Sequence, residues 1–158
     1  RHGQTNTHPL VLILDGITDP RNFGAILRVA DASGVDGVIV SKKHSAGFGP
    51  VVAKTASGAE ATVDVVQVPN IAQAMDVLKE AGYWIAGTTG GGRAVDYHKQ
   101  DFKMATALVM GSEGQGMGRL IEKKCDFLVK IPMLGSVDSL NVAAATAVFC
   151  FEFRRQNS

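Results

Sequence analysis

The sequence predicts an α/β protein with a mostly parallel sheet of six strands and helices on both faces. Short apolar runs alternate along the chain with segments whose apolar residues recur at helical spacing. Strands that alternate with helices are typical of βαβ units, which build a parallel sheet covered on both sides. A length of 158 residues fits a single domain with a substantial core.

The first strand and the first helix carry the clearest signals. Residues 10–14, LVLIL, form a continuous apolar run, which indicates a strand that is buried on both faces. Residues 19–34 then predict an amphipathic helix, with Pro20 near its start and Gly34 at its end. The apolar face of this helix consists of Phe23, Ile26, Leu27 and Ala30.

The rest of the chain continues the same alternation. Further strands are predicted at residues 35–40, 62–68, 83–87, 104–110 and 127–131. Further helices are predicted at residues 51–61, 71–81, 120–124 and 140–155. The Gly-rich or Ser-rich segments that follow the last three strands are predicted loops, at residues 88–102, 111–118 and 132–138.

The last predicted helix has one apolar face and a polar start. Its apolar positions recur at helical spacing and are Leu140, Ala144, Ala147, Val148 and Phe151. Asp138 or Ser139 can cap it. Taken alone, these residues fit an ordinary capped core helix. A Gly/Ser loop that opens into a helix also presents unpaired backbone N–H groups, so the same stretch can form a binding site.

Composition limits the classes of function. A net charge of +1 argues against a protein that coats nucleic acid through bulk electrostatics, although it allows a local basic patch. No apolar run approaches the roughly 18 residues of a membrane span. Cys125 and Cys150 form neither a CxxC motif nor a metal-binding spacing, so we interpret them as buried thiols of a reducing compartment. These features together indicate a cytoplasmic protein.

The two ends of the chain differ in character. Residues 1–8 are polar and begin with Arg rather than Met, so we interpret them as the end of a linker that followed an upstream region. Residues 9–158 are expected to form the folded domain. If so, part of the working protein precedes this sequence.

Common nucleotide and metal motifs are absent. The Gly114–Gly116 pair begins a possible G-x-G-x-x-G fingerprint, but the third glycine position is occupied by Arg119. A P-loop fails in the same segment, because Met117 and Gly118 occupy the positions of its Lys and Ser/Thr. The four histidines are scattered without a ligand spacing, so no metal site is predicted.

The candidate site lies in the loops that follow the last three predicted strands. In an open parallel sheet, ligands bind beyond the carboxyl ends of the strands. The polar residues best placed to act are Glu113, Ser139 and Asn141, and the first helix adds Asn22 and Arg28. Each has a plain structural alternative. Arg28 could pair with an aspartate one turn away, Glu113 could be a turn carboxylate, and Asn22 could be a helix cap.

Three motifs taken together resemble a known family. They are N-x-G-x-x-x-R in the first helix, M-G-S-E-G-x-G after the fifth strand, and I-P-M-x-G-x-x-x-S-L-N-V-A-x-A at the start of the last helix. In this order they resemble the signatures of the SpoU (TrmH) family of S-adenosylmethionine-dependent RNA ribose 2′-O-methyltransferases, in the SPOUT superfamily. The stretches LDGITDPRNFGAILR and KTASGA look most like the subgroup that methylates a guanosine of bacterial large-subunit rRNA.

The resemblance implies a fold and an assembly that periodicity alone does not. It implies a C-terminal trefoil (α/β) knot, in which the last stretch is threaded through a loop and the knotted region binds S-adenosylmethionine. It further implies a homodimer with the site at the subunit interface. An RNA-binding domain is expected on the N-terminal side, absent from this chain, so residues 9–158 would be the SpoU-type catalytic domain.

Residue roles follow by position in the motifs. The resemblance implies that Arg28 acts as the base or binds the target phosphate, that Asn22 and Glu113 position it, and that Ser139 and Asn141 complete a polar wall. The cofactor is expected at the backbone of Thr88, Gly111, Ile131, Met133 and Leu140. Nearby basic residues that could contact RNA phosphates are Arg21, Lys42, Lys43 and Lys54, for which a solvated surface is the alternative.

Rival interpretations belong to other classes. A non-catalytic RNA-binding scaffold could keep the fold, but the complete set of motif residues disfavours it. A nicotinamide-dependent oxidoreductase is disfavoured by the missing glycine fingerprint. Within the preferred class, a methylase of tRNA or a ribosome-targeting resistance methylase is the alternative, since the absent domain is expected to select the substrate.

Overall fold

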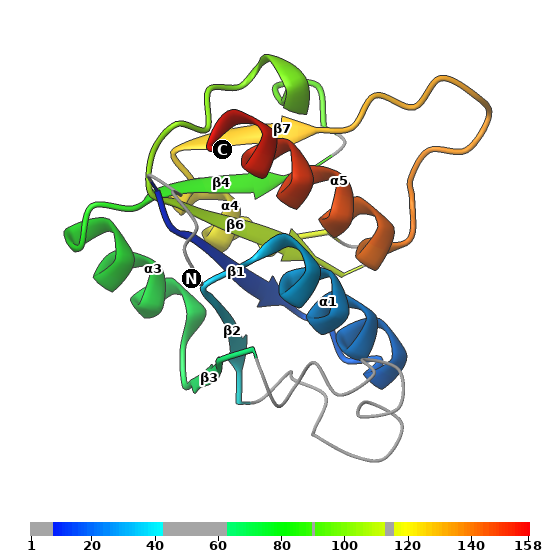
Figure 1. The fold of residues 1–158 in the computed structure, drawn as a ribbon. Coiled ribbons are helices and arrows are strands. Elements are labelled where there is room, and N and C mark those ends of the chain that lie inside the picture. The colour runs from blue at the N-terminus through cyan, green and yellow to red at the C-terminus, as the bar shows by residue number, and fades with distance from the viewer. Residues whose placement is uncertain (1–7, 43–62, 90, 113–115) are drawn as a thin grey trace.

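The computed structural model describes residues 8–42, 63–89, 91–112 and 116–158. Its strands form one seven-stranded sheet in the order β3-β2-β1-β6-β4-β7-β5, and every pairing in it is parallel (Figure 1). The strands are β1 (Leu10–Asp15), β2 (Gly37–Ser41), β3 (Val65–Val68), β4 (Trp84–Thr88), β5 (Val95–Asp96), β6 (Thr106–Gly111) and β7 (Phe127–Lys130). The helices are α1 (Pro20–Ser33), α3 (Ile71–Glu80), η2 (Tyr97–Lys99), α4 (Arg119–Lys124) and α5 (Val142–Gln156).

The parallel α/β architecture is confirmed, and the strand count is corrected from six to seven. The additional strand, β5, lies inside residues 88–102, which were predicted as a loop. It consists of two residues that pair with β7, Val95 with Val129 and Asp96 with Lys130. Two residues are too few to show any period. The predicted helix at residues 51–61 lies outside the described residues, and the C-terminal knot stays a prediction.

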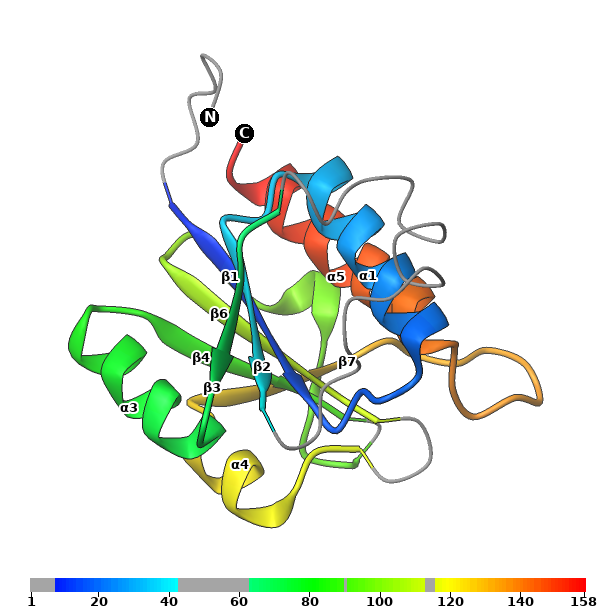
Figure 2. The same ribbon diagram turned by 90° about the horizontal axis from the view of Figure 1, so that it is seen from below.

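Helices cover the sheet on both faces. In Figure 2, α1 and α5 lie side by side on one face, while α3 and α4 lie on the other. The central strand β1 shows the two layers directly, because Leu12 packs with the α1 and α5 side and Ile13 with the α3 and α4 side, and both are fully buried. The continuous apolar run was therefore interpreted correctly. No helix in the described part of the chain is long and apolar enough to span a membrane.

The ends of α1 are set by local sequence chemistry. The Asp19 carboxylate accepts a hydrogen bond from the Arg21 N–H at 2.9 Å, and Pro20 occupies the first helical position, where no N–H is needed. Gly34 ends the helix with a φ of 72°, in the left-handed region that glycine adopts without steric cost. The predicted bounds of this helix are confirmed.

Helix α5 begins later than predicted. Its cap is Asn141 rather than Asp138 or Ser139, since the Asn141 Oδ1 accepts hydrogen bonds from the N–H groups of Ala143 and Ala144 at 2.9 and 3.2 Å. Residues 131–141 are therefore an extended loop, so Ser139 and Leu140 belong to the loop and not to the helix.

The predicted apolar face of α5 does not pack on the sheet. Its buried residues are Val142, Ala143, Thr146, Phe149, Cys150, Glu152 and Phe153. On the predicted face, by contrast, Phe151 is 50% exposed, Leu140 is 38% exposed and Ala144 is exposed. The helix is apolar on both sides, so spacing alone could not select the side that faces the core.

Candidate functional site

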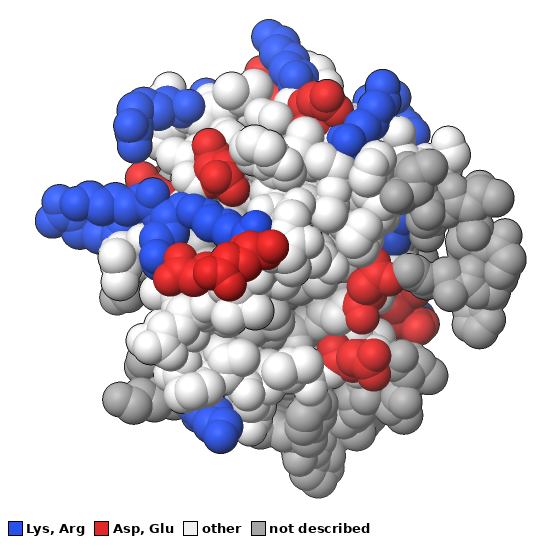
Figure 3. All heavy atoms as spheres, turned by 90° about the vertical axis from the view of Figure 1, so that its left-hand side faces the viewer, with Lys and Arg blue, Asp and Glu red and all other residues white. Residues whose placement is uncertain are grey.

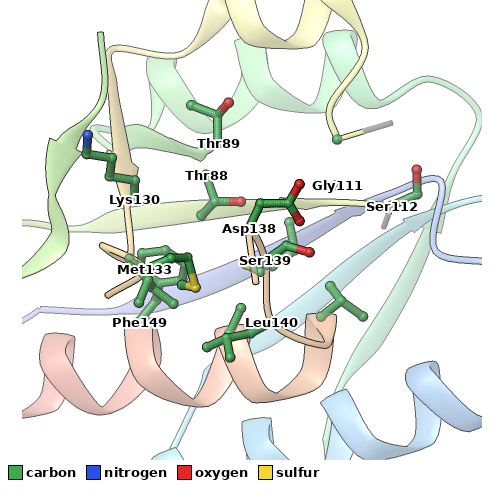
Figure 4. A pocket seen from close by; sticks show the side chains of 15 residues that line it. Thr88, Thr89, Gly111, Ser112, Lys130, Met133, Asp138, Ser139, Leu140 and Phe149 are labelled. Carbon is green, nitrogen blue, oxygen red and sulfur yellow. The ribbon is translucent and has the colours of Figure 1, made fainter. Parts of the chain in front are cut away.

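A pocket opens at the carboxyl ends of β4, β6 and β7, against the first turns of α5 (Figure 4). Its volume of about 150 Å³ is far more than the roughly 10–15 Å³ that one water needs, so it can admit part of an organic ligand. The lining residues are Thr88, Thr89, Met110, Gly111, Ser112, Gly116, Lys130, Ile131, Met133, Asp138, Ser139, Leu140, Val142, Ala145 and Phe149. Many of them come from the loops predicted beyond the strand ends, and Val142, Ala145 and Phe149 come from α5.

The residues expected to hold a cofactor gather in this pocket. All of them line it, namely Thr88, Gly111, Ile131, Met133 and Leu140. They come from three separate connections that the parallel register brings to one edge of the sheet. Thr88 also has a structural task, because its hydroxyl donates to the backbone oxygen of Val109 at 2.7 Å and ties β4 to β6 beside the opening.

The lining divides into apolar and polar parts. Met110, Val142, Ala145 and Phe149 provide apolar surface. Thr89, Ser112, Lys130, Asp138 and Ser139 provide hydroxyls and charges of both signs (Figure 4). Ligand pockets commonly combine an apolar wall with a few polar groups that fix orientation. This lining fits a ligand that carries both a flat apolar group and charged substituents.

Gly111 permits the backbone of Gly116 and Met117 to lie close against the end of β6. Ser112 and Gly116 form a bridge, with the Gly116 N–H donating to the Ser112 oxygen at 2.7 Å. A Cβ on Gly111 would lie 2.3 Å from the carbonyl carbon of Gly116, closer than atoms can approach. Any larger residue would therefore displace this loop from the pocket wall.

Two of the predicted catalytic residues meet at the pocket rim. The Asn141 Nδ2 donates a hydrogen bond to the Asn22 Oδ1 at 3.0 Å, although 119 positions separate the residues in sequence. Because Ser139, Leu140 and Val142 line the pocket, Asn141 sits at its edge. One asparagine thus caps α5 and ties it to α1.

Arg28 does not belong to this pocket within one chain. It is exposed on α1, on the side opposite the residues that the helix buries, and it does not line the cavity. This position agrees with the sequence, in which helical spacing puts Arg28 away from the apolar face formed by Phe23, Ile26, Leu27 and Ala30. Glu113, the remaining predicted catalytic residue, lies outside the described residues.

The predicted RNA-contacting residues are only partly described. Arg21 is exposed at the start of α1, and Lys42 is exposed directly after β2. The start of α1 and the end of β2 both lie at the carboxyl edge of the sheet, where the pocket also opens. Lys43 and Lys54 lie outside the described residues.

Sequence reasoning missed several polar residues of the pocket. Asp138 was considered only as a helix cap, and Thr89, Ser112 and Lys130 were not singled out. Each is adjacent to, or within a few positions of, a predicted cofactor residue. Treating every polar residue next to a strand end as a candidate would have found them.

The cysteines provide no reactive centre in this structure. Burial raises the pKa of the Cys125 and Cys150 thiols to about 12, so both are neutral thiols near neutral pH. The described residues also contain no group of three or more His, Cys, Asp or Glu side chains that could hold a metal ion.

The fold and the pocket together indicate a general class of protein. A doubly covered parallel sheet with a mixed pocket at its carboxyl edge is the arrangement of α/β proteins that bind a small organic ligand. A model of the SpoU rRNA Methylase family matches residues 9–151. The chain belongs to this family, as its three motifs predicted.

Relatives extend the comparison. A protein of Staphylococcus aureus (strain COL), whose name assigns it to the TrmH family of tRNA/rRNA methyltransferases, is 50% identical over 93% of this chain. The chain spans 59% of that relative's length.

Solved structures share the fold. The SpoU methyltransferase AviRb from Streptomyces viridochromogenes, crystallised with the cofactor AdoMet, matches with a TM-score of 0.85 and 31% identity, covering 98% of this chain and 62% of AviRb. An RNA 2′-O ribose methyltransferase matches with a TM-score of 0.84 and 28% identity, covering 97% of this chain and 58% of that protein.

We expect Asn141 to be the residue that fixes the pocket rim. Replacing Asn141 with Ala removes both the cap of α5 and the bond to Asn22, so the free energy of unfolding should fall by about 1 kcal/mol or more. Asn141→Asp keeps the capping oxygen and loses only the donor to Asn22, so most of the cap energy should remain. Urea denaturation of the two variants measures the difference. Equal losses for Ala and Asp would contradict the capping role.

Proposed function

We propose that the chain is the catalytic part of an S-adenosylmethionine-dependent RNA methyltransferase that acts on a ribose 2′-hydroxyl. One observation carries the proposal. A single pocket is lined by all the expected cofactor residues and bordered by Asn141 and its partner Asn22. Family membership, the AdoMet complex of AviRb and the structural match to an RNA 2′-O ribose methyltransferase support it.

The lining of the pocket suits this cofactor. The apolar surface of Met110, Ala145 and Phe149 can cover an adenine ring, and the polar residues can bind the ribose and amino-acid parts. When bound, S-adenosylmethionine supplies a methyl group on a positively charged sulfur. The residues of the chain would hold and orient that group.

The acceptor hydroxyl requires help from the protein. A ribose hydroxyl is a poor nucleophile, so transfer needs alignment with the sulfur–methyl bond and a group that weakens the O–H bond. Arginine stays protonated in proteins, so we assign Arg28 to binding the target phosphate and polarising the hydroxyl. Asn22 and Glu113 would position this arginine and the ribose, and Ser139 with Asn141 would complete the polar wall.

Because Arg28 does not line the pocket of its own chain, we propose that it serves the pocket of a partner in a homodimer. The predicted apolar face supports this assembly, because Ala144 and Phe151 of α5 are exposed and Leu140, on the loop just before the helix, is 38% exposed. Ala147 and Val148, which lie between them on α5, are half-buried. Leu140 belongs both to this face and to the pocket lining, so a partner bound there would border the ligand. Exposed apolar surface of this kind is typical of interfaces.

Arg28→Ala should abolish methyl transfer to RNA and leave cofactor affinity nearly unchanged, because Arg28 is exposed and does not line the pocket. Transfer of a labelled methyl group measures activity, and calorimetry measures cofactor binding. Arg155→Ala is the matched control, since Arg155 is an exposed arginine near the end of α5, pairs with Glu152 at 2.8 Å and does not line the pocket. Retained activity of Arg28→Ala would remove Arg28 from the mechanism. A parent chain that binds no cofactor would instead favour the non-catalytic scaffold.

Phe151→Asp should shift the protein from dimer to monomer, because it places a charge in the proposed apolar interface. Sedimentation velocity measures the assembly state. Val77→Asp is the control, since Val77 is a 65% exposed apolar residue of α3, on the opposite face of the sheet. If Phe151→Asp leaves the parent assembly unchanged, the face of α5 is not the interface.

We assign the RNA contact to the carboxyl edge of the sheet, with Arg21, Lys42, Lys43 and Lys54 as the phosphate-binding residues. The opposite edge is less suited, because basic and acidic side chains alternate there (Figure 3). One example is the Arg155–Glu152 pair at 2.8 Å. Phosphate binding needs positive charge that neighbouring carboxylates do not neutralise.

The proposed substrate is a guanosine of 23S rRNA, and the proposed location is the cytoplasm. We further propose that an RNA-binding domain lies on the N-terminal side of residues 9–158 and that residues 1–8 form the linker to it. A tRNA substrate is the alternative, and the name of the Staphylococcus relative includes both RNA classes. A ribosome-targeting resistance methylase is the other alternative.

Deletion of the gene should remove one 2′-O-methyl mark from 23S rRNA. Mass-spectrometric mapping of 2′-O-methyl positions in rRNA and tRNA measures this loss. Loss of a tRNA mark alone would favour the alternative.

A further inference from the structure

Asp138 brings a negative charge into the polar part of the pocket. It lies on the loop between β7 and α5, and its carboxylate points into the cavity (Figure 4). The residue is exposed, so its carboxylate stays open to a ligand in the cavity. Neither the cap of α5 nor the expected catalytic set uses this side chain, since Asn141 provides the cap.

The two charges of the pocket lie in different parts of it. In the view of Figure 4, Thr88 lies between Lys130 and Asp138. Asp138 is next to Ser139 and three positions before Asn141, which bonds to Asn22 at the rim. In the proposed reaction the methyl group must face the acceptor ribose, which Asn22 and Asn141 are proposed to border. With the methyl group in this orientation, the sulfur that carries it would lie on the Asp138 side of the pocket.

We propose that Asp138 is a specificity-determining residue that selects the positively charged sulfonium of the methyl donor over the uncharged thioether of the spent cofactor. This inference rests on the proposed function. In methyl transfer the sulfur–carbon bond breaks and its electron pair stays on sulfur, an oxygen–carbon bond forms, and the hydroxyl proton passes to solvent water. The sulfur loses its positive charge, so its attraction to the carboxylate disappears and the product is held less tightly than the donor.

The exposure of Asp138 sets the size of its expected effect on cofactor affinity. A charge pair in contact with water is screened and contributes little, so the carboxylate should alter affinity by about three- to fivefold rather than by orders of magnitude. The effect should also shrink as salt is added, because added ions screen exposed charges. A neutral amide of the same shape removes the charge without altering the size of the side chain.

The test compares two ligands on three proteins. Calorimetry measures the Kd of S-adenosylmethionine and of S-adenosylhomocysteine for the parent chain, Asp138→Asn and Asp64→Asn. Asp64 is an exposed aspartate just before β3 and outside the pocket lining, so its variant controls for net charge. For Asp138→Asn we expect the preference for the methylated cofactor to fall about three- to fivefold, with S-adenosylhomocysteine affinity unchanged. Asp64→Asn should leave both affinities unchanged.

The outcomes separate the inference from the function on which it rests. If the parent chain binds neither ligand, the proposed function fails. If the parent chain binds both and Asp138→Asn leaves their ratio unchanged, the inference fails and the proposed function stands. An equal loss for both ligands would assign the carboxylate to a group that they share, such as the ammonium, and would equally overturn the inference. Circular dichroism melting confirms that the variants are folded.

Discussion

The parallel register of β1, β6, β4 and β7 is the constraint on which the site depends. Asp15 pairs with Gly111 and Gly87 with Val109, so the strands end together at one edge of the sheet. Both faces of the sheet are closed by helices, and β1 is fully buried between them. Polar side chains can therefore gather mainly at the ends of the strands, where three connections from distant parts of the sequence form one pocket.

A second constraint fixes α5 to α1 at both ends. Near their starts, Asn141 donates to Asn22. Near their ends, the Arg154 guanidinium donates to the backbone oxygens of Ser33 and Gly34. The two helices therefore run in the same direction, and the loop over residues 131–141 is held between β7 and a fixed helix start. A shift of α1 would be transmitted to the pocket wall through one asparagine.

The sequence allowed much of this arrangement to be predicted, because strong local signals and tertiary structure agree. The apolar run of β1, the start of α1 near Pro20 and its end at Gly34, and the position of the pocket beyond the strand ends were interpreted correctly. The errors occurred where local signals were weak or duplicated. Strand β5 has two residues and depends on its neighbour β7. At the start of α5 the sequence suggested Asp138 or Ser139 as the cap, whereas the observed cap is Asn141, which is also held by a tertiary bond to Asn22.

The misassigned face of α5 has a physical explanation that also concerns Arg28. The helix is apolar on two sides, and the sheet can bury only one of them, so Phe151 and Ala144 remain exposed. Arg28, on the neighbouring helix, is exposed and does not line the pocket of its own chain. A second subunit on α5, as proposed, would bury the exposed apolar surface at the pocket rim. The same association would supply the arginine that each pocket lacks, so one event would complete both the packing and the chemistry.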